Sequence, residues 1–191
     1  MKISFKEINT LANYISLLRV LLAIPIFILL DHINESYDYR LILGFICLVV
    51  VATDLLDGYF ARKYNSVTEV GKIIDPFADK LCMGIIVVKL YLIGEIPGYF
   101  FWIVIFRDLI IFIGGIIVSK IINKVLPSNM LGKITAFFIG VFVLADILGV
   151  REFESIYYSL MYFCIMLCFA SLIGYGIRGY ETIKYYKNGT I

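Results

Sequence analysis

Six stretches of mostly apolar residues follow one another along the chain, with short polar breaks such as "DHINESYD", "GEIPG", "LPSN" and "VREFE". A helix needs about 20 mainly apolar residues to cross the hydrocarbon of a bilayer, where every backbone hydrogen bond must be made within the segment. The pattern therefore predicts six transmembrane helices, near residues 11–30, 40–60, 76–94, 99–119, 132–149 and 155–177.

Composition supports a membrane class for the whole chain. Hydrophobic residues make up 61% of the 191 residues, charged residues make up 17%, and the mean hydropathy is +0.93. A soluble domain has a far more polar balance. Because no linker or low-complexity run divides the chain, we expect an all-α integral membrane protein with a single domain over residues 1–191.

The positions of the basic residues predict how the helices are oriented. Lys and Arg in short loops are retained in the cytoplasm. Arg40 and Arg151 fall on one side of the predicted bundle, and the other side carries Lys2, Lys6, Arg62, Lys63, Lys72, Lys80, Lys120, Lys124, Lys133, Arg178, Lys184 and Lys187. Both termini are therefore expected in the cytoplasm, in a multi-pass protein of the cell (inner) membrane.

Two features argue against other kinds of chemistry. The formal charge of +2 is too small, and no soluble face carries a basic stripe, so we expect no nucleic-acid partner. The four cysteines lie inside apolar runs without the spacing of a zinc site, and we interpret them as small buried hydrophobic residues. Within the predicted helices, Lys89 is expected to snorkel outward.

Four aspartates lie where the second predicted helix ends and the third begins, at the cytoplasmic side. Asp54 and Asp57 are three residues apart, and Asp75 and Asp79 are four apart. On a helix, residues at either spacing share a face. If the two helices face each other, four carboxylates converge on one spot.

So many carboxylates need a counter-charge, and two sources are open. Arg62, Lys72 and Lys80 could neutralise them in ordinary salt bridges. Alternatively, hard divalent cations could hold the cluster together, because Mg²⁺ and Mn²⁺ prefer carboxylate oxygens and four of these could support two ions. Paired metal ions are typical of phosphate chemistry.

The residues around the aspartates fit a phosphate ligand. Gly58, Ala61 and Gly71 have little or no side chain, so a bulky ligand can approach the helix backbone. Arg62 supplies a planar set of donors for a phosphate or a base carbonyl.

These residues also resemble a known signature. The run Asp54-x-x-Asp57-Gly58-x-x-Ala61-Arg62, followed after eight residues by Gly71-x-x-x-Asp75-x-x-x-Asp79, is similar to that of the CDP-alcohol phosphatidyltransferases at all eight fixed positions. The signature covers residues 54–79. Six predicted helices and the segment "NYISLLRVLLAIP" extend the resemblance over most of the chain.

The resemblance implies a site that faces the cytoplasm, holds two Mg²⁺ or Mn²⁺ ions, and displaces CMP from a CDP-linked lipid by the hydroxyl of a second alcohol. The implied metal ligands are Asp54, Asp57, Asp75 and Asp79, of which Asp79 would border the second metal and act as general base. The implied contacts to the cytidine diphosphate are Asp57, Gly58, Ala61, Arg62 and Gly71. Proteins of this family are expected to be homodimers.

The acceptor alcohol has to be inferred from other parts of the chain. The start with Asn13, Ser16 and Arg19, and the stretch with Gly132, Lys133 and Thr135, resemble the phosphatidylglycerophosphate synthases of this family. We therefore expect CDP-diacylglycerol and a phosphorylated small alcohol, sn-glycerol 3-phosphate, as partners.

Three residues are candidate acceptor contacts: Arg107, Lys133 and Thr135. Lys133 lies at the start of the fifth predicted helix. It either contacts the acceptor phosphate there, where the helix N-terminus also favours an anion, or it is one more cytoplasmic anchor. Arg107 either pairs with a carboxylate such as Asp108 or faces the polar cavity. The Arg107-Asp108 pair also occurs in cardiolipin synthases, so phosphatidylglycerol, inositol phosphate and serine stay open as acceptors.

Two other classes of function fit the sequence less well. A small cation transporter would carry carboxylates throughout the bundle and internal repeats, and the sequence has neither. A purely structural membrane protein would have no use for glycines beside the carboxylates.

Overall fold

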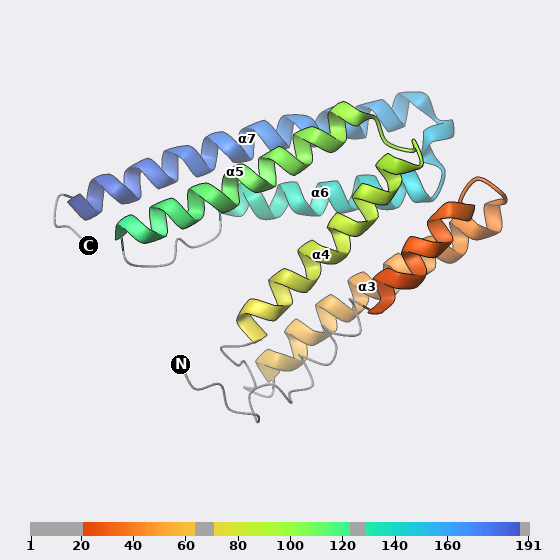
Figure 1. Cartoon of the computed structure of the whole chain (residues 1–191), viewed down its shortest axis with the longest axis horizontal. Helices are drawn as coiled ribbons and strands as arrows, with labels where there is room; N and C mark the ends of the chain where they lie inside the picture. Colours follow the sequence, from red (N-terminus) through yellow and green to blue (C-terminus); the bar gives the residue numbers. More distant parts are fainter. Residues whose placement is uncertain (1–20, 64–70, 123–128, 188–191) are drawn as a thin grey trace. The chain divides into compact units, whose positions relative to one another are not determined.

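The computed structural model describes residues 21–63, 71–122 and 129–187, and the regular structure in these ranges is helical (Figure 1). The first helix is described over residues 21–29 and continues into η1 (Leu30–His32). The elements that follow are α3 (Tyr37–Lys63), α4 (Gly71–Leu92), α5 (Gly98–Ile122), α6 (Met130–Ile147), η2 (Val150–Glu152) and α7 (Glu154–Lys187). Within the described ranges each predicted segment coincides with a helix, which confirms the all-α class, and residues 11–20 of the first segment lie outside these ranges.

Three of the helices in the described ranges are long and apolar enough to cross a membrane, namely α5, α6 and α7. The described part of the first helix is apolar but shorter. The charged motif residues make the end of α3 and the start of α4 less apolar. The protein is therefore a helical membrane protein.

The largest boundary error concerns α7. Its apolar run predicts an end near residue 177, but the helix continues to Lys187. Hydropathy marks where the hydrocarbon ends rather than where the helix ends. The sequence signal for a stop, Asn188-Gly189, comes only after that point.

The chain forms two compact units, which are described separately. The first contains the residues up to Glu95 together with Ile147–Gly149, and the second contains Ile96–Asp146 and the residues from Val150 onward. The first unit thus includes the end of α3 and the start of α4. The second includes α5, α6 and α7.

In the first unit, α4 ends in a glycine turn. Gly94 has a φ of 78°, in the left-handed region that glycine adopts without steric cost. The N–H of Glu95 donates to the Leu90 carbonyl at 2.9 Å, and the N–H of Gly94 donates to the Tyr91 carbonyl at 3.1 Å. These bonds satisfy carbonyls at the helix end and turn Glu95 back toward the unit.

Glu95 is buried in a polar cluster that we call the Arg40 cluster, formed by Asn34, Arg40 and Glu95. Asn34 Nδ2 donates to Glu95 Oε1 at 2.7 Å, and Arg40 Nη2 donates to Asn34 Oδ1 at 2.7 Å. Arg40 Nη2 also lies 3.6 Å from Glu95 Oε1, and Arg40 Nη1 donates to the Ile147 carbonyl at 3.4 Å. The cluster ties the start of α3 to the turn after α4.

Lys89 does not extend outward as expected, because only 8% of its surface is exposed. It lies in the last turn of α4, where its stem is buried and its Nζ reaches Asp31 Oδ1 at 2.6 Å. The ammonium also lies 4.2 Å from the centre of the Phe27 ring. An ion pair and a cation–π contact thus compensate a charge that apolar residues surround.

In the second unit, aromatic rings fill the core between the helices. Phe100 and Phe142 are fully buried with ring centres 4.6 Å apart, and Phe142 lies 5.3 Å from Tyr157. Cys164 and Cys168 are buried and free, as is Cys82 in the first unit, while Cys47 is half-buried and free. Three of the four cysteines are therefore buried as interpreted, and Cys47 is only partly so.

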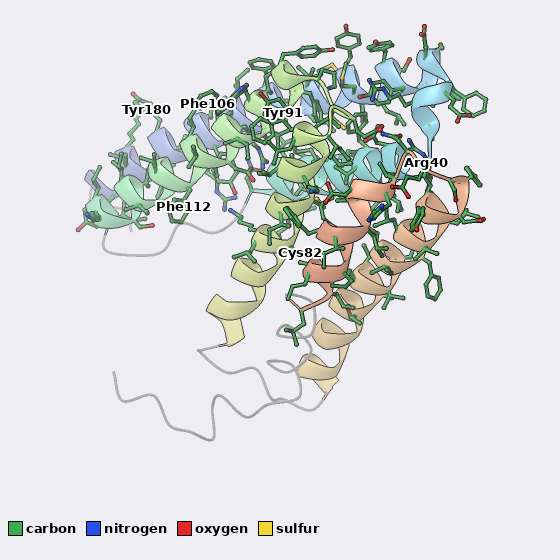
Figure 2. All side chains as sticks on the ribbon, turned by 45° about the vertical axis from the view of Figure 1, so that its right-hand side comes forward. Arg40, Cys82, Tyr91, Phe106, Phe112 and Tyr180 are labelled. Carbon is green, nitrogen blue, oxygen red and sulfur yellow. The ribbon has the colours of Figure 1, made fainter. Side chains whose placement is uncertain are left out.

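Large apolar side chains also cover the outside of α5. Trp102, Phe106, Ile110, Phe112 and Ile113 are exposed, and Figure 2 shows Phe106 and Phe112 on this helix. Water-facing surfaces rarely carry so much contiguous apolar area. Hydrocarbon is the medium that this face fits.

The Arg40 cluster predicts a stability effect. Arg40→Ala removes the cation that faces the buried Glu95 carboxylate, and breaking a buried pair in this way costs about 3 kcal/mol. We expect a clear fall in Tm for the purified protein in detergent. Arg151→Ala, at an exposed arginine, is the control and should change stability by less than about 1 kcal/mol. An unchanged Tm for Arg40→Ala would show that the cluster does not stabilise the fold.

Candidate functional site

The eight motif residues fall on two consecutive helices. Asp54, Asp57, Gly58, Ala61 and Arg62 lie in the last third of α3, and Gly71, Asp75 and Asp79 lie in the first part of α4. The structure confirms that both halves of the motif are helical. The structure does not describe the side chains of residues 54–79. That the four carboxylates converge on one spot therefore stays a prediction.

The type and spacing of the donors fit hard divalent cations. Each helix contributes two carboxylates about one turn apart, and carboxylate oxygen is the ligand that Mg²⁺ and Mn²⁺ prefer. Among the residues whose side chains are described, no group of three or more His, Cys, Asp or Glu could hold a metal ion. The aspartates at 54, 57, 75 and 79 are outside that set and remain the candidate ligands.

In the second unit, Arg107 joins three helices. It lies in the middle of α5 with only 6% of its surface exposed. Its Nε–H donates to Ser171 Oγ on α7 at 3.0 Å, its Nη2 donates to the Gly132 carbonyl on α6 at 3.2 Å, and its Nη1 donates to the Asp108 carboxylate. Of the two roles predicted for Arg107, the pairing with Asp108 is therefore confirmed.

The first turn of α6 packs closely on α7. The N–H of Asn129 donates to the hydroxyl oxygen of Tyr175 at 3.2 Å, and the Asn129 side chain accepts the N–H of Leu131 at 3.3 Å. A β-carbon on Gly132 would lie 2.9 Å from the Tyr175 ring, and one on Gly174 would lie 2.9 Å from Asn129 Nδ2. Glycine at these positions is what allows the two helices to approach.

The other two candidate acceptor contacts occupy different environments in α6. Lys133 is exposed in the first turn of the helix. Thr135 is fully buried, and its hydroxyl lies 2.7 Å from the Leu131 carbonyl and 3.2 Å from the Leu167 carbonyl on α7. Its single proton is thus used between helices, whereas Lys133 can meet a ligand.

The second unit therefore brings Arg107, Gly132, Lys133 and Thr135 together around one end of α6. Sequence reasoning missed Ser171 and Tyr175, which hold this end from α7. The available signal was weak: both are polar residues at the end of an apolar run, where a polar side chain in hydrocarbon needs a partner.

Comparison with known proteins agrees with the motif. The family model of the CDP-alcohol phosphatidyltransferases matches residues 9–172, which include all eight motif positions. The chain is also similar to proteins named CDP-diacylglycerol–glycerol-3-phosphate 3-phosphatidyltransferase. One from Rickettsia bellii is 32% identical over 80% of this chain and 83% of the relative, and one from Aquifex aeolicus is 30% identical over 90% and 96%.

A third protein of that name, from Rickettsia typhi, is 44% identical over 93 residues. This match covers 47% of the chain and about half, 51%, of the relative. The family match itself covers most of the chain, both helices of the motif and the start of α6. The chain thus belongs to the CDP-alcohol phosphatidyltransferase family.

Proposed function

We propose that the protein transfers the phosphatidyl group of CDP-diacylglycerol to sn-glycerol 3-phosphate, releasing CMP and forming phosphatidylglycerol phosphate. The observation that carries this proposal is the complete motif of eight residues within a family match over residues 9–172. The names of the relatives that align over most of the chain support this acceptor.

In the proposed reaction, a hydroxyl oxygen of glycerol 3-phosphate attacks the phosphorus that bears the diacylglycerol. A new P–O bond forms to the acceptor, and the bond from this phosphorus to the oxygen of CMP breaks. The hydroxyl proton passes to Asp79, which lies one turn beyond Asp75 on α4.

We propose two Mg²⁺ or Mn²⁺ ions as cofactors, held by Asp54, Asp57, Asp75 and Asp79. When bound, such ions neutralise phosphate charge and stabilise the attacking and leaving oxygens. Asp57 also belongs to the proposed binding site for the cytidine diphosphate, with Gly58, Ala61, Arg62 and Gly71. Small residues there permit close approach of the nucleotide, and the arginine supplies donors.

Lys133 is the proposed main contact to the phosphate of the acceptor. Its exposed ammonium lies in the first turn of α6, where the helix dipole also favours an anion. A guanidinium has five N–H donors, and Arg107 uses three of them in its hydrogen bonds to Ser171, Gly132 and Asp108. We propose that the other two can contact the acceptor phosphate. Thr135 stays a predicted contact, although its hydroxyl proton is already used.

We also propose that six transmembrane helices place both termini and the active site at the cytoplasmic face of the inner cell membrane. The excess of Lys and Arg on one side of the bundle supports this orientation. We propose a homodimer in which part of the exposed apolar surface is covered by a second copy.

The acceptor is tested by CMP release from purified protein supplied with CDP-diacylglycerol and single acceptors. We expect turnover with glycerol 3-phosphate. Lys133→Ala should raise the KM for glycerol 3-phosphate about tenfold and leave that for CDP-diacylglycerol within twofold, because only the acceptor loses a charge-assisted contact. Turnover with phosphatidylglycerol, inositol phosphate or serine instead would assign another acceptor, and no CMP release with any of them would remove the enzymatic proposal.

Metal dependence and the role of Asp79 are tested together. Activity should require Mg²⁺ or Mn²⁺ and be lost in excess EDTA. Asp57→Asn should raise the metal concentration needed for activity, whereas Asp79→Asn should bind CDP-diacylglycerol normally and lower kcat at least 100-fold, the usual size of a general-base contribution. Asp38→Asn, an exposed aspartate at the start of α3, is the control. A kcat near wild type for Asp79→Asn would exclude it as the base.

The orientation is tested by labelling single cysteines in intact cells, after the four native cysteines are replaced. Cysteines in place of Glu35 and Glu152, both exposed, should react with an impermeant reagent from outside. A cysteine in place of Ser66 should react only after the membrane is opened. The reverse pattern would place the aspartates on the outer face.

A further inference from the structure

The start of α6 lies beside the middle of its two neighbours rather than beside their ends. Arg107, which contacts Gly132, is followed on α5 by roughly 22 Å of helix before Ile122, at 1.5 Å per residue. Ser171 is followed on α7 by roughly 24 Å of helix before Lys187. The turn that carries Lys133 is therefore fixed by lateral contacts to the two longer helices.

We propose that Ser171 and Tyr175, two residues of α7, are positioning residues for the acceptor phosphate. They act through Arg107 and through the backbone of α6, and they set where the first turn of α6 holds Lys133. This inference rests on the proposed function, in which Lys133 binds the phosphate of glycerol 3-phosphate.

Ser171 orients Arg107. It is fully buried, and its hydroxyl donates to the Cys168 carbonyl at 2.8 Å. Because the one hydroxyl proton is used there, the oxygen presents a lone pair to the Nε–H of Arg107 at 3.0 Å. This bond holds the guanidinium plane so that Nη2 meets the Gly132 carbonyl, one residue before Lys133.

Tyr175 holds the same turn from its other side. Its hydroxyl accepts the N–H of Asn129, one of the N–H groups at a helix start that have no partner within the helix. Its ring packs where a β-carbon on Gly132 would lie 2.9 Å away. The two contacts hold the backbone at positions 129 and 132, and neither involves the ammonium of Lys133.

The expected kinetic signature follows from where the substrates bind. The proposed contacts to CDP-diacylglycerol lie on α3 and α4, whereas the turn held by Ser171 and Tyr175 carries the proposed contact to the acceptor. Loosening this turn should therefore weaken binding of glycerol 3-phosphate selectively. A merely structural role would lower stability and affect both substrates equally.

The test compares Ser171→Ala and Tyr175→Phe with matched controls on the same helix. Each variant should raise the KM for glycerol 3-phosphate about fivefold, the effect of one lost hydrogen bond, and leave the KM for CDP-diacylglycerol within twofold. Ser171→Thr keeps the hydroxyl and should restore most of the affinity. Ser159→Ala and Tyr180→Phe change exposed residues of α7 and should leave both KM values within twofold of wild type.

The possible failures can be told apart. If wild-type protein does not use glycerol 3-phosphate, the proposed function fails and this inference fails with it. If wild-type protein uses it and Lys133→Ala raises its KM, but Ser171→Ala and Tyr175→Phe lower only Tm or raise both KM values equally, the positioning role alone is wrong. Tyr175→Phe gives a separate result should Ser171→Ala not fold.

Discussion

A polar group inside an apolar helix bundle has to find its partner within the protein, and this constraint determines much of the described structure. Water is not available in hydrocarbon to satisfy an N–H or a charge. Arg107 accordingly bonds to Ser171, Gly132 and Asp108, and Thr135 bonds to carbonyls of its own helix and of α7. These bonds set which helices lie together, because apolar packing alone is less directional.

The same constraint separates the two kinds of charged group in this chain. Arg107 donates to acceptors within the protein, so its place in the fold does not depend on a ligand. Four aspartates on two helices cannot satisfy one another, because like charges repel. In the proposed function, a pair of divalent ions supplies their counter-charge. On that proposal, Arg107 and the four aspartates differ in whether the compensating group belongs to the protein.

The sequence could predict the helices and the position of the motif, because both depend on local patterns. In the described ranges, hydropathy located the helix ends within a few residues except the start of α4 and the end of α7, and the spacing of the aspartates was already compatible with helical backbone on both sides. It could not predict which residue meets Arg107, since Ser171 lies 64 positions further on and nothing in the periodicity pairs the two. It also could not distinguish Thr135 from Lys133, because burial decides which of them can meet a ligand, and burial depends on the packing of α6 against α7.

The short length of α6 also bears on the bilayer itself. Its 18 residues extend over about 27 Å, slightly less than the hydrocarbon thickness of a typical membrane, whereas α7, with 34 residues, extends over about 51 Å. A helix that is too short for its bilayer is accommodated by local thinning of the lipid or by snorkelling of flanking residues. Lys133 is such a flanking residue. Thinning of the bilayer at α6 would bring the headgroup layer closer to Lys133. On the proposed function, lipid composition would then affect, through membrane thickness, how far a water-soluble acceptor has to travel to reach the lipid substrate.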